Sequence, residues 1–209
     1  MGNKYLSSDL SKHLVANAYL RNRLGGSRLS KNVRSSVYDK VGTLCDDPVG
    51  LTCSIYTLRR YGKAKEIVNF ASFIALKKAL LCGEITGGWV PGAFPGNAGF
   101  LLSGEFEIAD LPIMQIPDIV LAGTTTVPPD PADVVYRHPA TADIFHKIDT
   151  EYACVSDELS NSMAAKKLID HGENAIAVTN SLCSDHYGLF VYQILTVGAL
   201  MPFYLYSRN

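Results

Sequence analysis

The stretch SNSMAAKKLIDHGENAIAVTNSLCSDHYGL, residues 160–189, decides the fold class of this chain. The residues that follow Ser160 predict a helix over about 161–170, and the apolar run at 175–178 predicts a buried strand. A second, short helix is expected over 181–186. Because helix and strand alternate in this stretch, it indicates an α/β fold.

The same alternation continues through the upstream half of the chain. Thr52 or Ser54 can cap a helix that ends at Tyr61, and Ser72 can cap another that Gly83 closes. Strands are expected over 37–44, 66–70, 89–91, 106–109, 113–122, 134–136, 153–155, 189–195 and 200–206. This order of elements implies a largely parallel sheet that is covered by helices.

Residues 124–133, TTTVPPDPAD, have the clearest turn composition in the chain. A break at this place suits a second lobe, with ligands bound between the lobes at the carboxyl ends of the strands. We therefore expect a two-lobed α/β fold. Lobe one is expected to cover about 37–115 plus 190–209, and lobe two about 116–189.

The first 36 residues form a separate element in this interpretation. Leu6, Leu10, Leu14 and Ala18 recur at helical spacing, and a basic tract follows them. We interpret residues 1–36 as an N-terminal helical extension that packs on the body of the protein or on a second subunit. A role in binding nucleic acid or another anion is the less favoured alternative.

The composition argues against several classes of protein. The chain has 209 residues, of which 47% are hydrophobic and 19% are charged, and its formal net charge of -1 gives no reason to expect nucleic acid or a membrane surface as a partner. Its five cysteines form no Cys-x-x-Cys pair, and polar residues stand where a signal peptide has its apolar core. No apolar run reaches the roughly 18 residues of a membrane span. We therefore expect a cytoplasmic protein with reduced thiols.

Three loops with oxygen-bearing side chains precede predicted helices, at 47–54, 158–165 and 178–181. A helix N-terminus exposes unpaired N–H groups and the positive end of the helix dipole, so it can hold a carboxylate without an arginine. Each loop alone is more often an ordinary helix cap. Three of them at strand–helix junctions favour a site for a dicarboxylate. The histidines share no metal-ligand spacing and no nucleotide-binding loop is present, so we expect neither a metal nor an organic cofactor.

The same segments resemble the prephenate dehydratase family. HPATADIF (138–145) is similar to a His-Pro segment of these enzymes, and SNSMAAKKL (160–168) is similar to their Ser-Thr-Ser-Ala-Ala segment. NAIAVTNSLCSDHYGL (174–189) resembles the strand and short helix that follow there. GTLCDDPVGLTCS (42–54) looks like a diverged Leu-Gly-Pro-x-Gly-Thr opening with an insertion. The resemblance covers about 41–206 and implies a two-lobed, periplasmic-binding-protein-like α/β fold of the prephenate dehydratase type, with a ligand cleft between the lobes.

The resemblance also implies a set of site residues. It assigns catalytic roles to Thr52, Ser162 and Met201. It assigns substrate binding to Gly50, Leu51, Cys53, Ser54, His138, Asn161, Met163, Asn180 and Phe203.

The chain departs from the dehydratases in ways that bear on its chemistry. Their last strand carries Thr-Arg-Phe, where the threonine assists departure of the ring hydroxyl and the arginine anchors a carboxylate. This chain has Met201-Pro202-Phe203 instead, and it lacks the Pro-x-Glu-Asn-Ser segment. The pattern resembles the prephenate decarboxylases of the bacilysin and aeruginosin pathways, which remove carbon dioxide without aromatising the ring. That resemblance implies a homodimer without cofactors that yields dihydro-4-hydroxyphenylpyruvate for a peptide natural product.

Two alternatives remain open beside the decarboxylase. One is a dehydratase with altered residues, which the missing Thr-Arg-Phe disfavours because dehydration needs a positioned acid. The other is a non-catalytic ligand-binding module, because binding proteins and regulators share the two-lobed architecture. The latter predicts an attached DNA-binding domain or a signal peptide, and the sequence indicates neither.

Overall fold

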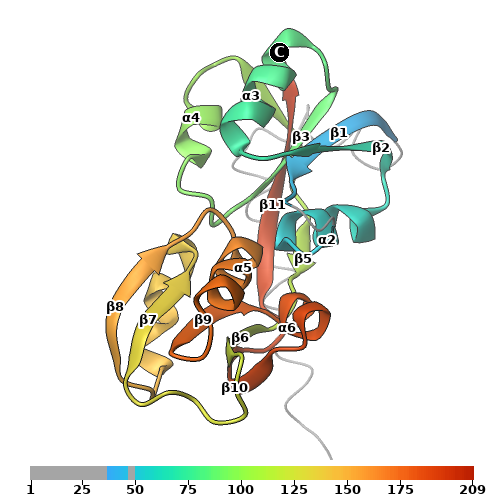
Figure 1. Ribbon diagram of the computed structural model, residues 1–209. Coiled ribbons are helices and arrows are strands. Elements are labelled where there is room, and N and C mark those ends of the chain that lie inside the picture. The colour runs from blue at the N-terminus through green and yellow to red at the C-terminus, as the bar shows by residue number, and fades with distance from the viewer. Residues whose placement is uncertain (1–36, 47–49) are drawn as a thin grey trace, which may run out of the picture. The chain divides into compact units, whose positions relative to one another are not determined.

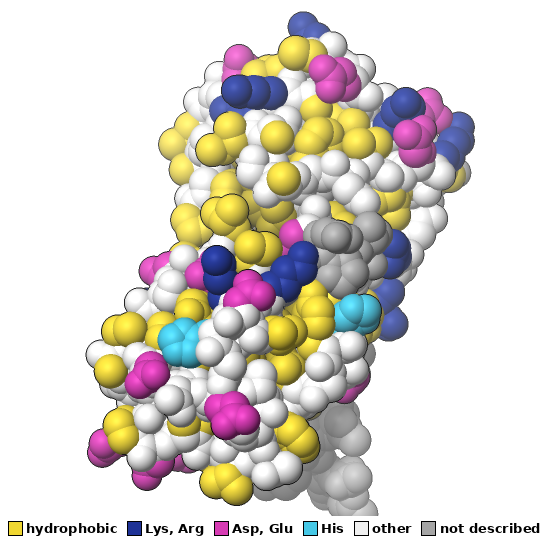
Figure 2. All heavy atoms as spheres, viewed as in Figure 1, with side chains coloured by type: hydrophobic (Ala, Val, Ile, Leu, Met, Phe, Trp, Pro, Cys, Tyr) yellow, Lys and Arg dark blue, Asp and Glu magenta, His cyan; other side chains and the backbone are white. Residues whose placement is uncertain are grey.

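The computed structural model describes residues 37–46 and 50–209, which form two β-sheets flanked by helices (Figure 1). The predicted helical extension, 1–36, lies outside the described residues. None of the described helices is long and apolar enough to cross a membrane. Basic and acidic side chains are interspersed on the face shown in Figure 2, in line with the formal net charge of -1.

The first sheet has the strand order β2-β1-β3-β11-β4, and β5 pairs with β11 beyond this path. Strand β1 is parallel to β2 and β3, whereas β11 is antiparallel to all its neighbours. The strands are β1 (Tyr38–Leu44), β2 (Ala64–Phe70), β3 (Gly87–Pro91), β4 (Phe106–Asp110), β5 (Ile113–Gln115) and β11 (Leu200–Arg208). The helices of this part are α2 (Cys53–Tyr61), α3 (Phe73–Cys82) and α4 (Asn97–Leu101).

The second sheet has the strand order β10-β6-β9-β7-β8. Strand β7 is parallel to β8 and β9, while β6 is antiparallel to β9 and β10. The strands are β6 (Ile119–Gly123), β7 (Ala132–Arg137), β8 (Tyr152–Asp157), β9 (Ala175–Asn180) and β10 (Phe190–Thr196). The helices are the 3-10 helix η1 (Pro139–Lys147), α5 (Asn161–His171) and α6 (Ser181–Tyr187).

The structure confirms the two-lobed α/β class and corrects four expectations about its layout. Both sheets are mixed rather than largely parallel, because strands that cross from one sheet to the other run antiparallel to their new neighbours. Strand β10 pairs with β6, so residues 190–196 belong to the second sheet and not to lobe one. The turn-rich segment 124–133 connects β6 to β7 within the second sheet and does not separate the lobes. The expected strand 113–122 is interrupted between β5 and β6.

The chain crosses between the sheets at two segments that lie side by side, 116–118 and 197–199. The Ile116 N–H donates to the Ala199 carbonyl at 2.9 Å, and the Gly198 N–H donates to Asp118 Oδ1 at 2.7 Å. The Asp118 carbonyl also accepts the Ser181 N–H, at the start of α6, at 2.9 Å. The two crossings are therefore tied to each other and to the second sheet's last helix.

Trp89 organises the core of the first sheet. Its side chain is fully buried, stacks on Phe203 with ring centroids 5.1 Å apart, and donates from Nε1 to Thr57 Oγ1 at 3.1 Å. The Trp89 carbonyl accepts the Thr43 hydroxyl at 2.9 Å. Phe203 is itself fully buried, so it packs in the core, whereas the sequence predicted that it binds substrate.

We expect Phe203→Ala to lower the free energy of unfolding by about 3–5 kcal/mol, because it removes a buried ring and leaves a cavity beside Trp89. Leu200→Ala, on the same strand, should change stability by less than about 0.5 kcal/mol, because Leu200 is exposed. Urea denaturation followed by tryptophan fluorescence measures both. Equal stabilities of the two variants would show that Phe203 is not a core residue.

Candidate functional site

Three helices begin at the junction of the two lobes, and each has a side-chain cap. Thr52 Oγ1 accepts the Ile55 N–H at the start of α2 and donates to the Leu44 carbonyl at the end of β1. Ser160 Oγ accepts the Met163 N–H at 2.9 Å at the start of α5. Asn180 Oδ1 accepts the Cys183 N–H at 3.1 Å at the start of α6. The predicted caps at these three loops are confirmed.

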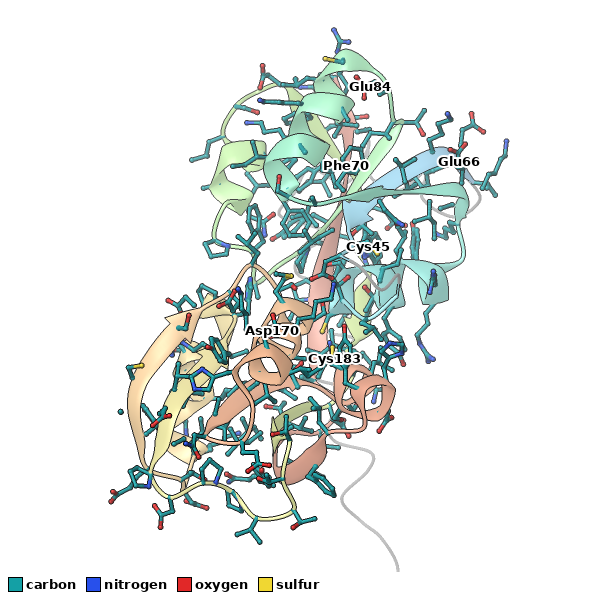
Figure 3. The ribbon with its side chains drawn as sticks, in the orientation of Figure 1. Cys45, Glu66, Phe70, Glu84, Asp170 and Cys183 are labelled. Carbon is teal, nitrogen blue, oxygen red and sulfur yellow. The ribbon has the colours of Figure 1, made fainter. Side chains whose placement is uncertain are left out.

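The three caps come together because α2 in the first lobe bonds directly to the second lobe. Asn180 Nδ2 donates to the Leu51 carbonyl at 2.8 Å, and the Cys183 thiol lies 3.8 Å from the same oxygen. The Asn161 amide lies 3.8 Å from Cys53 Sγ, and Asn180 Nδ2 lies 3.9 Å from it. The N-termini of α2, α5 and α6 therefore form one hydrogen-bonded cluster, called here the cap cluster. Figure 3 labels Cys183 on α6 and Cys45, which precedes Asp46 in the sequence.

A carboxylate of the chain itself is held in the cap cluster. Asp46, just beyond β1, accepts hydrogen bonds from the hydroxyls of Ser160 and Ser162, the latter at 2.5 Å. The two serine hydroxyls also lie 3.1 Å apart. Asp46 was not among the site residues predicted from the sequence. Its only signal there was an acidic residue in the loop before the first capped helix.

Two thiols complete the cap cluster, of which Cys183 is buried and Cys53 is partly buried. Loss of solvent raises the pKa of Cys53 to about 11, and the amides of Asn161 and Asn180 oppose this shift in part. Burial likewise raises the pKa of Cys183 to about 12. Both groups are therefore neutral thiols near pH 7, able to donate a hydrogen bond but poor as nucleophiles.

One buried polar atom in the cap cluster has no hydrogen-bond partner among the described residues. Asn161 Oδ1 is buried, and no described residue donates a hydrogen bond to it. Its amide nitrogen faces Cys53, and its backbone carbonyl accepts the Thr179 hydroxyl at 2.6 Å. A buried amide oxygen without a donor costs free energy, so this position suits a donor group from a bound molecule.

Ser54, Met163 and Gly50 were also predicted as site residues, and they lie on or next to the capped helices. Ser54 is buried within α2, and Met163 takes part through its backbone N–H. Gly50 has a φ of 112° that favours glycine, and a Cβ there would come within 2.6 Å of the Arg59 guanidinium. The structure thus groups Thr52, Leu51, Cys53, Asn161, Ser162, Met163 and Asn180.

Three other predicted residues are not joined to the cap cluster by any hydrogen bond between described residues. His138 caps η1 by accepting the Ala140 N–H on Nδ1 at 3.2 Å, and burial lowers its pKa while Asp157 opposes that shift. Met201 is partly buried on β11, opposite Met114 of β5. Phe203 lies in the core.

No metal centre is built from the described side chains. Nowhere in residues 37–46 and 50–209 do three or more His, Cys, Asp or Glu side chains gather in a way that could hold a metal ion. The cap cluster contains hydroxyls, carboxamides, thiols and one carboxylate, which suit hydrogen bonding to a polar organic molecule.

Sequence comparison identifies no relatives, since no protein-family model matches the chain and no curated protein is similar to it. Solved structures share its fold. A prephenate dehydratase from Arthrobacter aurescens, in complex with L-Phe, has a TM-score of 0.59 at 17% identity, over 81% of this chain and 60% of that one. A quorum-quenching acylase has a TM-score of 0.55 at 16% identity, over 81% and 64%. A methionine-binding protein has a TM-score of 0.50 at 14% identity, over 82% and 83%.

These similarities define the class of the fold and no more. The chain has the two-lobed α/β fold found in prephenate dehydratases and in small-molecule-binding proteins. It spans less than two thirds of the length of the dehydratase and of the acylase. Because a dehydratase, an acylase and a binding protein share this fold, function has to be argued from the residues of the cap cluster.

We expect the buried thiols to resist alkylation. At pH 8 a thiol with a pKa of about 11 is ionised in only about one molecule in a thousand, so iodoacetamide should modify exposed Cys82 and Cys154 well before Cys53. The Cys53 rate should rise about tenfold from pH 8 to pH 9. Peptide mass spectrometry after timed quenching measures each site. Modification of Cys53 as fast as Cys154 would contradict its burial.

Proposed function

We propose that this chain is a prephenate decarboxylase that releases carbon dioxide without aromatising the ring and yields dihydro-4-hydroxyphenylpyruvate. The observation that carries the proposal is the cap cluster, where three capped helix N-termini from both lobes meet and α5 holds the carboxylate of Asp46. Prephenate is a small dianion, and helix N-termini bind such groups by their free N–H donors and their dipoles. The fold shared with a prephenate dehydratase supports the same substrate class.

The two reactions of prephenate place different demands on the protein. Dehydration expels hydroxide together with carbon dioxide, so an acid must protonate the leaving hydroxyl. In decarboxylation alone, the electrons of the bond to carbon dioxide move into the diene and a proton is added to a ring carbon. The second reaction retains the hydroxyl. A site that offers the hydroxyl an acceptor and no acid therefore favours it.

The chain has residues that fit the second demand. Met201 and Pro202 stand where the dehydratase pattern has a threonine and an arginine, so neither an acid nor a cation is present at those positions. Asn161 Oδ1 is a buried acceptor without a described donor, and it fits the ring hydroxyl. Accepting that hydrogen bond holds the hydroxyl in place without protonating its oxygen. On this proposal Ser160, Ser162 and Asn180 position the carboxylates.

The second candidate is a protein that binds a small carboxylic acid without changing it. The similarity to a methionine-binding protein favours this alternative, because the same two lobes serve binding alone in that protein. Product analysis separates the two candidates, because a binding protein leaves prephenate unchanged.

The central experiment is incubation of the full chain with prephenate. We expect carbon dioxide release at a rate above the spontaneous one, with a non-aromatic 2-oxo acid as product. Heat-denatured protein is the control for spontaneous decay, and chelator-dialysed protein tests the expected independence from metal. Phenylpyruvate as the sole product would overturn the decarboxylase in favour of a dehydratase. Recovery of all the prephenate would exclude both reactions and leave the binding protein as the remaining candidate.

Asn161→Ala should weaken prephenate binding by about five- to tenfold, because it removes the acceptor proposed for the ring hydroxyl, a hydrogen bond of about 1 kcal/mol. Asn174→Ala changes an exposed asparagine before β9 and serves as the matched control. Calorimetric titration with prephenate measures both variants. Unchanged affinity of Asn161→Ala would remove this residue from the site.

A further inference from the structure

Asp46 links the two lobes through its carboxylate. The residue follows β1 of the first sheet, and both of its hydroxyl donors stand at the start of α5, beside the second sheet. Ser160 is the N-cap of α5 and Ser162 lies in its first turn, with side chains buried at 5% and 0% exposure. The carboxylate therefore sits at the positive end of an eleven-residue helix.

No cation accompanies this carboxylate among the described residues. The ion pairs of residues 37–46 and 50–209 involve other acidic groups, and none includes Asp46. Among the described residues, its negative charge is stabilised by two hydroxyl donors and by the dipole of α5. These are the interactions that a carboxylate of a ligand would make at the same place.

We propose that Asp46 is an internal competitor of the ligand, whose carboxylate fills the carboxylate position at α5 until the ligand displaces it. The inference rests on the proposed function for the location of the site, and it adds how the empty site is closed. Two carboxylates cannot share the hydroxyls of Ser160 and Ser162, because each hydroxyl has one proton to donate and like charges repel. Binding of the ligand at α5 therefore releases Asp46 and breaks this link between the lobes.

A second observation shows that Asp46 does not supply every hydrogen bond that the cap cluster needs. Asn161 Oδ1, on the residue between the two serines, is buried without a described donor. An ionised carboxylate only accepts hydrogen bonds, so Asp46 cannot supply that donor. A molecule with both a carboxylate and a hydroxyl can replace Asp46 and also satisfy Asn161. The cap cluster thus matches a hydroxyl-bearing carboxylic acid better than it matches its own aspartate.

The proposal is tested by whether removing the charge of Asp46 raises or lowers the affinity for prephenate. Asp46→Asn removes the competing charge and keeps the shape, so prephenate should bind about tenfold more tightly than to the unsubstituted chain. Asp39→Asn is the matched control, since Asp39 is an exposed residue of β1 paired with Lys65 and should leave affinity unchanged. If Asp46 instead serves to orient the two serines, Asp46→Asn lowers the affinity. Calorimetric titration of all three proteins with prephenate decides between these outcomes, and an unchanged or lowered affinity overturns the proposal.

A second variant and a second probe keep the test separate from folding and from the proposed function. Asp46→Ser, checked by urea denaturation, repeats the charge removal with a smaller side chain, and its affinity should also rise. Phenylpyruvate, a simple carboxylate, is titrated in parallel. In one outcome, prephenate binds to none of the proteins while phenylpyruvate binds more tightly to Asp46→Asn than to the unsubstituted chain. That result would contradict the proposed function and support Asp46 as an internal competitor. If neither compound binds more tightly to either Asp46 variant, the internal competitor is wrong, whatever the reaction proves to be.

Discussion

The return of the last strand to the first sheet is the constraint on which the rest of the structure depends. Strand β11 lies between β3 and β4 and also pairs with β5, so the first sheet is incomplete until the C-terminal residues join it. The chain must therefore cross between the sheets twice, at 116–118 and 197–199. Hydrogen bonds between these crossings fix the second sheet's last helix beside them. The N-termini of α5 and α6 are thereby brought to the start of α2.

The cap cluster shows how a chain with almost no net charge can hold a carboxylate. Asp46 is stabilised by two hydroxyls and the dipole of α5, without a described lysine or arginine as partner. Such a site depends on position, because a hydroxyl contributes only when its proton points at the anion. Cys183 and Asn180 beside it are buried, and a hydrogen bond is stronger where the local dielectric is low. Selectivity would then follow from the order of donors and acceptors rather than from charge attraction.

The sequence predicted what depends on near neighbours and missed what depends on distant ones. The helix starts at the three loops were found because a cap bonds to an N–H only three residues away, as Thr52, Ser160 and Asn180 do. Asp46 was missed because its partners lie 114 and 116 residues further along the chain. Strand β10 was assigned to the wrong lobe for the same reason, since its pairing with β6 leaves no local pattern. Phe203 was taken for a binding residue because stacking on Trp89 is invisible in the sequence.

Met201 and Pro202, which differ from the Thr-Arg of the dehydratase pattern, lie where the fold does not depend on those two side chains. These residues belong to the strand that closes the first sheet, where Pro202 pairs with Ile113 and its carbonyl accepts the Gly92 N–H at 2.8 Å. A proline is tolerated there because it need not donate to the ladder at this point, so the strand keeps its place without an arginine. Replacing a threonine and an arginine by a thioether and a pyrrolidine therefore changes the chemistry available on β11 while preserving the fold. The proposed recognition therefore rests on the capped helices, near whose starts several buried hydroxyls and an amide lie.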